Sequence, residues 1–342
     1  MSISHPVPND KLYLEQVKYG KDEQQRRKES PIFVSGDEVA KLLETNRGVY
    51  MVDPRLGFNN RTHRLFVSKH VPTETQDQLQ WKTLGHRHTV EAVIHWLAGK
   101  GYSIVDGVRY DWEAGDFINV PVFAWHRHVA LSKEPALHVA STTGPLYMGI
   151  GQAVYEDERY PEYWIYAQQG EDALRTLIPG GAVMEGAADG HSEASRLYAE
   201  QVAFAYNEEH RRRAGRVLVK GSELKFESTA MGNLAYVVDS RLGFHAKALA
   251  TIVAEIPPGK RSGAHRHLYD EIDYVLAGSG RCIVDDQSFE IKKGDTLAIP
   301  VFAWHQYFNT GDAPLRILAH STRPMLENLG LVLTHQGEHA DH

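Results

Sequence analysis

The sequence predicts a mainly all-β protein that contains two tandem copies of one antiparallel sandwich or barrel domain. Residues 86–126 align with residues 265–305 without a gap, and 18 of the 41 positions are identical. Within each copy, short runs rich in β-branched and aromatic residues recur roughly every 8–12 residues between Gly, Asp and Pro turn signals. The 342 residues of the chain also suffice for two domains of roughly 100–200 residues each.

Each copy is expected to open with a helix. Residues 10–28 and 193–213 both have helical spacing of apolar residues with polar faces, and both contain the pattern Leu-Tyr-x-Glu-Gln-Val. The two segments end in the basic clusters RRK (26–28) and RRR (211–213). We interpret these clusters as solvated helix ends that the helix dipole stabilises.

Strands are expected in the body of each copy. In the first copy they fall on the runs AVIHWLAG (92–99), GYSIVDG (101–107), DFINVPVF (116–123) and ALHVAST (136–142). Upstream of these runs, VDPRLGF (52–58) matches VDSRLGF (238–244), and the first copy then carries seven extra residues around Glu74–Trp81. We therefore predict an N-terminal domain over 1–150, a glycine-rich linker with a short helix over 151–195 and a C-terminal domain over 196–342.

Composition and charge disfavour several classes of protein. The chain is 42% hydrophobic and 24% charged, which is typical of a globular protein. Its net charge of −7 does not favour binding to nucleic acid or anionic lipid. The single cysteine, Cys282, cannot form an internal disulfide, no apolar run approaches the roughly 20 residues of a spanning helix, and the first residues do not resemble a signal peptide. We therefore expect a cytoplasmic protein without nucleic-acid or membrane partners.

Three histidines in each copy have the spacing of a metal site. Alternate strand residues point to the same face, so His86 and His88 share a face, and His126 ends a later strand that can pair beside them. The second copy repeats this spacing at His265, His267 and His305. Three neutral imidazoles suit Fe, Mn, Ni, Cu or Zn and leave coordination positions open. One His-x-His pair alone would equally fit a packed surface pair, but its recurrence with a third histidine favours metal binding.

The two expected sites differ by one carboxylate. Glu271 is in phase with the histidines of the second copy, whereas its counterpart in the first copy is Ala92 and the neighbouring Glu91 falls on the other face. The first site is therefore a neutral triad with more open positions. Such a triad suits a substrate that chelates through two oxygens beside O₂, so we expect the chemistry at the first site.

Two neighbours of the first triad are candidate catalytic residues. His128 is in phase with His126 and is placed to exchange a proton with substrate or oxygen, although a structural histidine at the barrel mouth is an equally open interpretation. Its counterpart is Tyr307. Arg127 is a candidate to bind a substrate carboxylate, although an exposed strand arginine is the simpler interpretation. His95 falls on the face opposite the ligands and is expected to be structural.

The pattern His-Arg-His…Gly-x-Gly…Gly-Asp…Pro…Trp-His resembles the cupin superfamily, in which His-x-His is followed by a glutamate and later by a third histidine. Two copies resemble a bicupin, which is a pair of double-stranded β-helix (jelly-roll) barrels. The segment HRHTVEAV, with alanine at the glutamate position, and the segment WHRH resemble the gentisate dioxygenase group, which includes salicylate and 1-hydroxy-2-naphthoate dioxygenases. The resemblance covers most of residues 40–150 and 225–325.

This resemblance implies an Fe(II)-dependent, extradiol-type, non-haem dioxygenase that uses O₂ to cleave a hydroxylated aromatic acid during aromatic compound degradation. It assigns the iron to the first triad and a supporting role to His128. The sequence departs from the group at Ile94, where the group tends to have an arginine that holds the substrate carboxylate. Another group must then bind the acid, and Arg61, Arg64 and Arg127 are the candidates.

Other functions remain open at this point. The second copy keeps a complete set of three histidines and a glutamate, which resembles oxalate decarboxylases and quercetin dioxygenases, and chemistry at this second site is the alternative. A non-catalytic, metal-binding bicupin is a further alternative. Cupins commonly pair edge strands between subunits, so the resemblance also implies a homo-oligomer.

Overall fold

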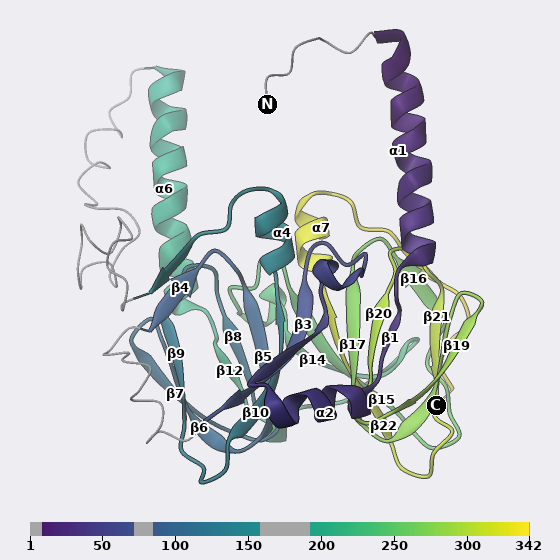
Figure 1. Cartoon of the computed structure of the whole chain (residues 1–342). Coiled ribbons are helices and arrows are strands. Elements are labelled where there is room, and N and C mark those ends of the chain that lie inside the picture. Colours follow the sequence, from purple (N-terminus) through teal and green to yellow (C-terminus); the bar gives the residue numbers. More distant parts are fainter. Residues whose placement is uncertain (1–8, 72–84, 158–191, 342) are drawn as a thin grey trace.

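The computed structural model describes residues 9–71, 85–157 and 192–341 and contains two β-barrels side by side (Figure 1). The predicted mainly β class and the tandem barrels are confirmed. The seven extra residues around Glu74–Trp81 lie outside the described residues, as do most of the linker and its expected helix. No helix within the described ranges is long and apolar enough to cross a membrane.

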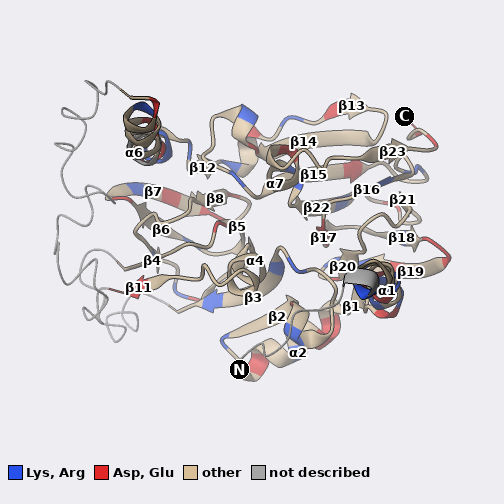
Figure 2. Cartoon of the chain, turned by 90° about the horizontal axis from the view of Figure 1, so that it is seen from above, with Lys and Arg blue, Asp and Glu red and all other residues tan. Residues whose placement is uncertain are grey.

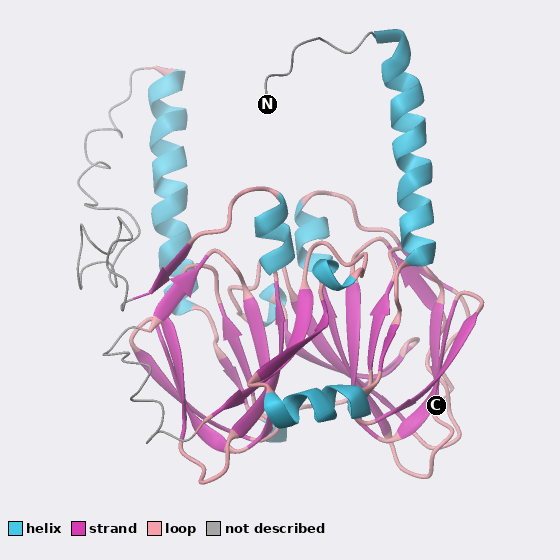
Figure 3. Cartoon of the chain, in the orientation of Figure 1, coloured by secondary structure: helices cyan, strands magenta, loops and turns pink. Residues whose placement is uncertain are grey.

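Helices are few and lie mostly at the same end of the two barrels (Figure 3). Within the described ranges they are α1 (Asn9–Glu29), α2 (Gly36–Thr45), α4 (Gly144–Gly149), α6 (Glu193–Ala214) and α7 (Arg323–Asn328), with the short 3-10 turns η1 (Pro54–Leu56), η5 (Gly221–Glu223) and η6 (Ser240–Leu242). The helices predicted over 10–28 and 193–213 are α1 and α6.

The N-terminal barrel consists of two antiparallel sheets that face each other. The six-stranded sheet has the order β12-β8-β5-β10-β3-β2, and the five-stranded sheet has the order β11-β4-β9-β6-β7. The strands are β2 (Gly48–Val52), β3 (Arg64–His70), β4 (His86–His88), β5 (Ala92–Ala98), β6 (Lys100–Val105), β7 (Val108–Glu113), β8 (Phe117–Val120), β9 (His126–Ala130), β10 (Ala136–Thr142), β11 (Tyr155–Asp157) and β12 (Leu218–Val219).

The C-terminal barrel repeats this arrangement. Its sheets have the orders β1-β20-β17-β22-β15-β14-β13 and β19-β18-β21-β16-β23. The strands are β1 (Phe33–Val34), β13 (Glu227–Thr229), β14 (Gly232–Val238), β15 (Ala250–Ile256), β16 (His265–His267), β17 (Glu271–Ala277), β18 (Ser279–Val284), β19 (Gln287–Lys292), β20 (Thr296–Ile299), β21 (His305–Phe308), β22 (Leu315–Ser321) and β23 (Thr334–Gln336).

Each barrel takes one edge strand from the other repeat. The strand β1, at the start of the first repeat, pairs with β20 of the C-terminal barrel, and β12, at the start of the second repeat, pairs with β8 of the N-terminal barrel. Seen from above, α1 accordingly stands over the C-terminal barrel and α6 beside the N-terminal barrel (Figure 2). The predicted boundaries follow the repeat in the sequence, whereas in space the leading segments cross to the opposite barrel.

Glycines permit the close approach of these crossing segments. A Cβ added at Gly36 would lie 2.5 Å from the backbone carbon of Gly294, and one added at Gly221 would lie 2.6 Å from the backbone oxygen of Gly115. The amide of Gly36 donates to Asp295 Oδ1 at 2.8 Å. The equivalent bond at Gly221 goes to Asp116 at 2.9 Å, so both crossings are held by the same contact.

The basic end of α6 corrects one expectation. Arg212 is only 5% exposed, and its Nε donates to Asp106 Oδ2 at 3.0 Å. The prediction of a fully solvated cluster is therefore wrong at this residue, because the last turn of α6 docks on the turn between β6 and β7. The equivalent end of α1 is solvated as expected, with Arg26 donating to Glu23 at 2.7 Å on the surface.

The larger sheets of the two barrels pack face to face and share one hydrophobic core. That core contains residues of both repeats, among them Leu65, Val93, Ile272 and Leu318, all fully buried. Each barrel also has an apolar cluster in its own interior. The alternation of side chains along the strands of the larger sheets thus gives one face to the junction of the barrels and the other face to the barrel interior.

Two buried carboxylates fasten the barrels to each other. Glu91 points away from the histidine face, as predicted, and accepts hydrogen bonds from the backbone amides of residues 247–249 at 2.9, 2.9 and 3.3 Å. Asp270, its counterpart in the second repeat, accepts from the amides of Arg61 and Thr62 at 3.0 and 3.2 Å. Each repeat therefore holds a loop of the other with one carboxylate.

Histidines are also buried where the barrels meet. His95 stacks on Phe117 with ring centroids 4.2 Å apart, and burial lowers the pKa of His95 to about 4. Burial likewise lowers the pKa of His320 to about 3, and the backbone oxygen of His320 bonds to His63 Nε2 at 3.2 Å. These imidazoles are neutral in the folded protein, and His95 packs against Phe117 of the shared core on the face opposite the ligands.

We predict that the junction weakens in acid. A histidine whose pKa is lowered on folding binds more protons in the unfolded chain, so stability falls as the pH drops below about 6.5. His95 alone contributes a loss of about 2 kcal/mol between pH 7 and pH 5. Denaturant unfolding at several pH values should show this slope, and His95→Gln should make it shallower. An unchanged slope in this variant would contradict the assignment.

Candidate metal centres

Strand pairing brings the first predicted triad together. His86 on β4 lies directly opposite His126 on β9 in the antiparallel ladder, and His88 follows on the same face of β4. The ring of His126 lies 4.2 Å from that of His86 and 4.7 Å from that of His88, measured between centroids. The three ligand atoms all lie within 4.8 Å of one another, which is a spacing that one metal ion can bridge.

Backbone carbonyls orient these rings for metal binding. His88 Nδ1 bonds to the carbonyl of Val90 at 2.7 Å, and His126 Nδ1 bonds to that of Ala124 at 2.8 Å. A carbonyl only accepts, so Nδ1 of each ring carries the proton and Nε2 presents a lone pair. Burial lowers the pKa of His126 to about 3 and also lowers that of His88, so both rings are neutral. The donor set therefore fits a divalent transition-metal ion.

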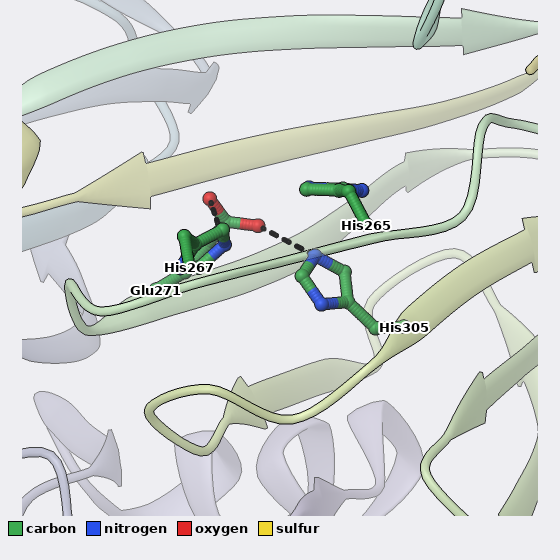
Figure 4. Close-up of side chains that lie close together, drawn as sticks. All are labelled: His265, His267, Glu271 and His305. Carbon is green, nitrogen blue, oxygen red and sulfur yellow. Dashed lines mark ion pairs between the residues drawn. The ribbon is translucent and has the colours of Figure 1, made fainter. Parts of the chain in front are cut away.

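The second predicted set also comes together, around the carboxylate of Glu271 (Figure 4). His265 lies opposite His305 in the ladder, with ring centroids 3.9 Å apart. The two oxygens of Glu271 lie 3.5 Å from His267 Nε2 and 3.6 Å from His305 Nε2. Neither of these buried nitrogens has a hydrogen-bond partner in the described part of the chain, as expected for groups that await a cation.

The same carbonyl pattern orients the second set. His267 Nδ1 bonds to the carbonyl of Tyr269 at 2.9 Å, and His305 Nδ1 bonds to that of Ala303 at 3.1 Å. Burial alone would raise the pKa of Glu271, but the adjacent His267 and His305 instead lower it well below the usual range. This centre therefore contains three imidazoles and one anionic ligand, which is also a suitable set for a transition metal.

The second centre opens into a cavity of about 240 Å³ with acidic and apolar walls. Glu271 and Asp273 both line it, and Tyr307 donates a hydrogen bond to Asp273. In the N-terminal barrel the positions of Glu271 and Asp273 are held by Ala92 and Ile94. The two centres therefore share their histidines but differ by two carboxyl groups.

Guanidinium groups also occupy matching places in the two barrels. Arg64 on β3 faces the interior of the N-terminal barrel, where its Nε donates to Thr142 at 3.0 Å and its charge helps to lower the pKa of His88. Gly144 allows this position, because a Cβ there would lie 2.9 Å from the guanidinium carbon. In the C-terminal barrel the residue that aligns with Gly144 is Arg323. There the guanidinium therefore comes from the segment that faces the Arg64 position, and not from the strand equivalent to β3.

The two arginines differ in how far other carboxylates neutralise them. Arg323 forms ion pairs with both Asp239 and Glu327. Among the described residues Arg64 has one such contact, at 3.6 Å to an Asp53 carboxylate that also holds Arg55 at 2.7 Å. Arg64 therefore retains more capacity to bind an anion.

His128 extends the first centre into the barrel. Its ring lies 5.7 Å from that of His126, and its Nδ1 lies 2.7 Å from the hydroxyl of Ser103. Trp112 Nε1 donates to the same hydroxyl at 3.0 Å, and this hydroxyl can still give its hydrogen to His128 Nδ1 or accept one from it. Burial lowers the pKa of His128 well below its usual value.

The structure does not bring Arg127 or Arg61 into the first centre. Arg127 lies between His126 and His128 on β9, so alternation turns it to the opposite face, where its ladder partner is Ile104. The side chain of Arg61 is 51% exposed and lies 3.5 Å from Glu23. Arg127 is one residue away from the ligand His126, so the alternation of side chains along a strand already places Arg127 on the opposite face.

Two interior residues have no sequence motif that reveals them. His70 at the end of β3 and His138 on β10 share a barrel interior with His128. A comparison of the repeats offers the only signal, because the corresponding residues of the second copy are Ile256 and Ile317.

Comparison with known proteins agrees with both barrels. A cupin domain model matches residues 79–141 and 252–321. The chain is 22% identical over 250 residues to 1-hydroxy-2-naphthoate 1,2-dioxygenase of Nocardioides sp. (strain KP7), and this match covers 72% of the chain and 61% of the relative. It is 23% identical over 249 residues to gentisate 1,2-dioxygenase 1 of Aquipseudomonas alcaligenes, which covers 72% and 67%. The chain thus spans about three fifths of the length of the first relative.

A solved structure shows the same fold along most of the chain. Salicylate 1,2-dioxygenase from Pseudaminobacter salicylatoxidans superposes with a TM-score of 0.62 at 14% sequence identity. The superposition covers 90% of this chain and 88% of the other.

We predict that the purified protein binds two transition-metal ions per chain, one at each cluster. His88→Gln and His267→Gln should each remove one ion, because each replaces one ligand of a different centre. The ion of the N-terminal centre should leave first on dialysis against a chelator, since that centre lacks an anionic ligand. Elemental analysis of the wild type and the two variants measures the number of metal ions bound per chain. One ion in the wild type, or two in both variants, would contradict the assignment.

Proposed function

This chain is a bicupin, and from that premise we propose that it is an Fe(II)-dependent dioxygenase that cleaves the ring of a hydroxylated aromatic acid at its N-terminal centre. The observation that carries the proposal is the neutral His86–His88–His126 triad beside the guanidinium of Arg64. The relatives named as gentisate and hydroxynaphthoate dioxygenases support the same reaction class. A homo-oligomeric state and a cytoplasmic location stay predictions.

In this proposal the triad holds iron(II). Such an ion, when bound, supplies the electron transfer between an aromatic ring and dioxygen, and the protein supplies binding and orientation. Three neutral ligands leave its charge uncompensated and leave coordination positions open. Ala92 preserves both properties, because it places no carboxylate where the other barrel has Glu271.

Charge favours the N-terminal centre for an acid substrate. Its described interior contributes the positive Arg64, whereas the C-terminal centre contains the anionic Glu271, and its Arg323 is already paired with two carboxylates. Burial raises the pKa of Asp273 well above its usual value, so this second carboxyl group of the cavity is neutral. A substrate that carries both a carboxylate and a phenolate is therefore attracted to the first centre and repelled by the second.

Arg64 is the residue that we propose to bind the substrate carboxylate in place of an arginine at Ile94. It faces the interior from β3, two strands from Ala92 in the same sheet, through the ladder pairs Arg64–Thr142 and Thr142–Ala92. The planar guanidinium offers five N–H donors, of which one is directed to Thr142. It can therefore hold a carboxylate through two parallel hydrogen bonds.

His128 is the residue that we propose to transfer a proton. Its ring adjoins that of His126, and with Ser103 as the donor to Nδ1 the proton of His128 is on Nε2. In this tautomer Nε2 is placed to give a hydrogen bond to an oxygen of substrate beside the triad, and in the other tautomer Nε2 can take a proton from it. Ile94, Trp96 and Ile118 form an apolar inner wall that excludes water from this proton.

We predict that oxygen consumption depends on the N-terminal triad. The protein should be loaded with Fe(II) without air and tested with gentisate, salicylate and 1-hydroxy-2-naphthoate. His88→Gln should lower turnover at least about 100-fold, because it removes an iron ligand. Glu271→Gln should leave most of the activity.

Loss of turnover in Glu271→Gln, with turnover retained in His88→Gln, would place the chemistry in the C-terminal barrel, where the ligand set is also complete. Absence of oxygen uptake with all three acids, in protein shown to contain iron, would count against a ring-cleaving dioxygenase of this class.

We further predict a specific role for Arg64 in binding. Arg64→Gln should raise KM for the acid by about 10–100-fold and change kcat less, since it removes charge-assisted hydrogen bonds. The KM of Arg64→Lys should lie between the values of the wild type and Arg64→Gln, because lysine keeps the positive charge but cannot form two parallel hydrogen bonds to a carboxylate. Arg323→Gln is the matched control in the other barrel, and we expect it to alter stability and not KM. Equal KM values in all four proteins would exclude Arg64.

A further inference from the structure

A group of three histidines lies inside the N-terminal barrel beyond the metal ligands. His70, His128 and His138 come from β3, β9 and β10. The ring of His70 lies 4.8 Å from that of His138 and 5.7 Å from that of His128, measured between centroids. Because His128 in turn adjoins His126, the rings form a continuous row from the metal centre into the barrel.

These rings face the barrel interior and not the junction of the barrels. Trp96 lies 5.3 Å from the rings of both His70 and His138, and Phe66 lies 5.9 Å from that of His138. Trp96 and Phe66 belong to the inner apolar cluster of this barrel. The three histidines are therefore polar groups set into an otherwise apolar inner wall.

Their polar atoms are only partly used by the protein. His138 is 4% exposed, and its Nδ1 has no hydrogen-bond partner among the described residues. Burial lowers the pKa of His70 to about 4 and that of His138 well below its usual value, so each ring is neutral and offers one donor and one acceptor. Within the described chain, the clusters with metal-ligand spacing are the two centres already described, so these rings do not form a third.

The other barrel shows that the fold does not need histidines at these places. The position of His70 is held there by Ile256, and that of His138 by Ile317, each in the equivalent register of the sheet. Both isoleucines are 1% exposed within the apolar core of that barrel. A buried imidazole with an unused polar atom is costly where isoleucine packs well, so a ligand is the better explanation for His138, and His70 lies next to it.

We propose that His70 and His138, with His128, form a polar subsite that binds an uncharged hydroxyl or amino group on the far edge of the aromatic acid. The inference rests on the proposed function, because it takes the acid to chelate the metal at the triad. Residues two apart on a strand are about 6.6 Å apart, so His128 lies one such step deeper than His126. The ring carbons opposite the chelating oxygens then point along the row toward His70 and His138.

This subsite makes the enzyme selective for acids that bear a second polar group. Neutral imidazoles can donate to or accept from a hydroxyl or amino group, and they match an uncharged group better than a second carboxylate. An acid without such a group leaves the imidazoles unsatisfied when it displaces water from them, so its affinity should be lower.

The test compares gentisate, which has a second ring hydroxyl, with salicylate, which lacks it. Dissociation constants should be measured by calorimetry on Fe(II)-loaded protein without oxygen. We expect the wild type to bind gentisate at least about tenfold more tightly than salicylate. His138→Ile, which copies the other barrel, should reduce this ratio at least about fivefold, and His70→Ile should reduce it as well. His138→Asn keeps a donor and an acceptor and should retain most of the preference.

His95→Gln is the matched control, because it removes a buried imidazole from the outer face of β5 and should leave the ratio unchanged. An unchanged ratio in both isoleucine variants, or a wild type that does not distinguish the two acids, would overturn the subsite. Failure of the wild type to bind either acid would overturn the proposed function and the subsite together. Binding that depends on His138 without oxygen uptake would support the subsite and reject the dioxygenase.

Discussion

Both metal centres depend on one backbone constraint, the antiparallel register that sets a histidine of a three-residue strand opposite the histidine that begins a later strand. This register places His86 against His126 and His265 against His305. The period of two then adds the next histidine of each short strand to the same face. Carbonyl groups two residues away fix the ring nitrogens, so the backbone determines both the position and the tautomer of the ligands. The side chains need little further support.

Local periodicity made much of this predictable. The duplicated pattern shows the two barrels, and counting by twos along a strand correctly brings the triads together, turns Glu91 outward and adds Glu271 to one centre alone. The same rule turns Arg127 away from the triad, although Arg127 was kept as a candidate because it adjoins His126. Contacts between segments distant in sequence were not predictable, because no local period encodes them. The crossing of β1 and β12 depends on sheet edges, and the burial of Arg212 depends on where its helix docks.

The two barrels show how a duplicated scaffold can acquire opposite electrostatics with few changes. The centre with a carboxylate ligand has its arginine paired to two acids, and the centre without one has an arginine with a single loose contact. The guanidinium comes from Arg64 in one barrel and from Arg323, opposite it across the sheet, in the other. Because glycine faces Arg64 while alanine, Ala250, is the counterpart of Arg64, each barrel has room for one such group.

The exchange of leading strands also has a consequence for the history of the chain. A fragment that held a single repeat would leave β8 or β20 with an open edge, and its own first strand would have no neighbour to join. Neither half can then be lost or separated without exposing a surface prone to aggregation. Even if only one barrel performed chemistry, the chain would have to keep the other barrel as structural support. The metal centre in that other barrel is therefore free to change its chemistry while the barrel itself is retained.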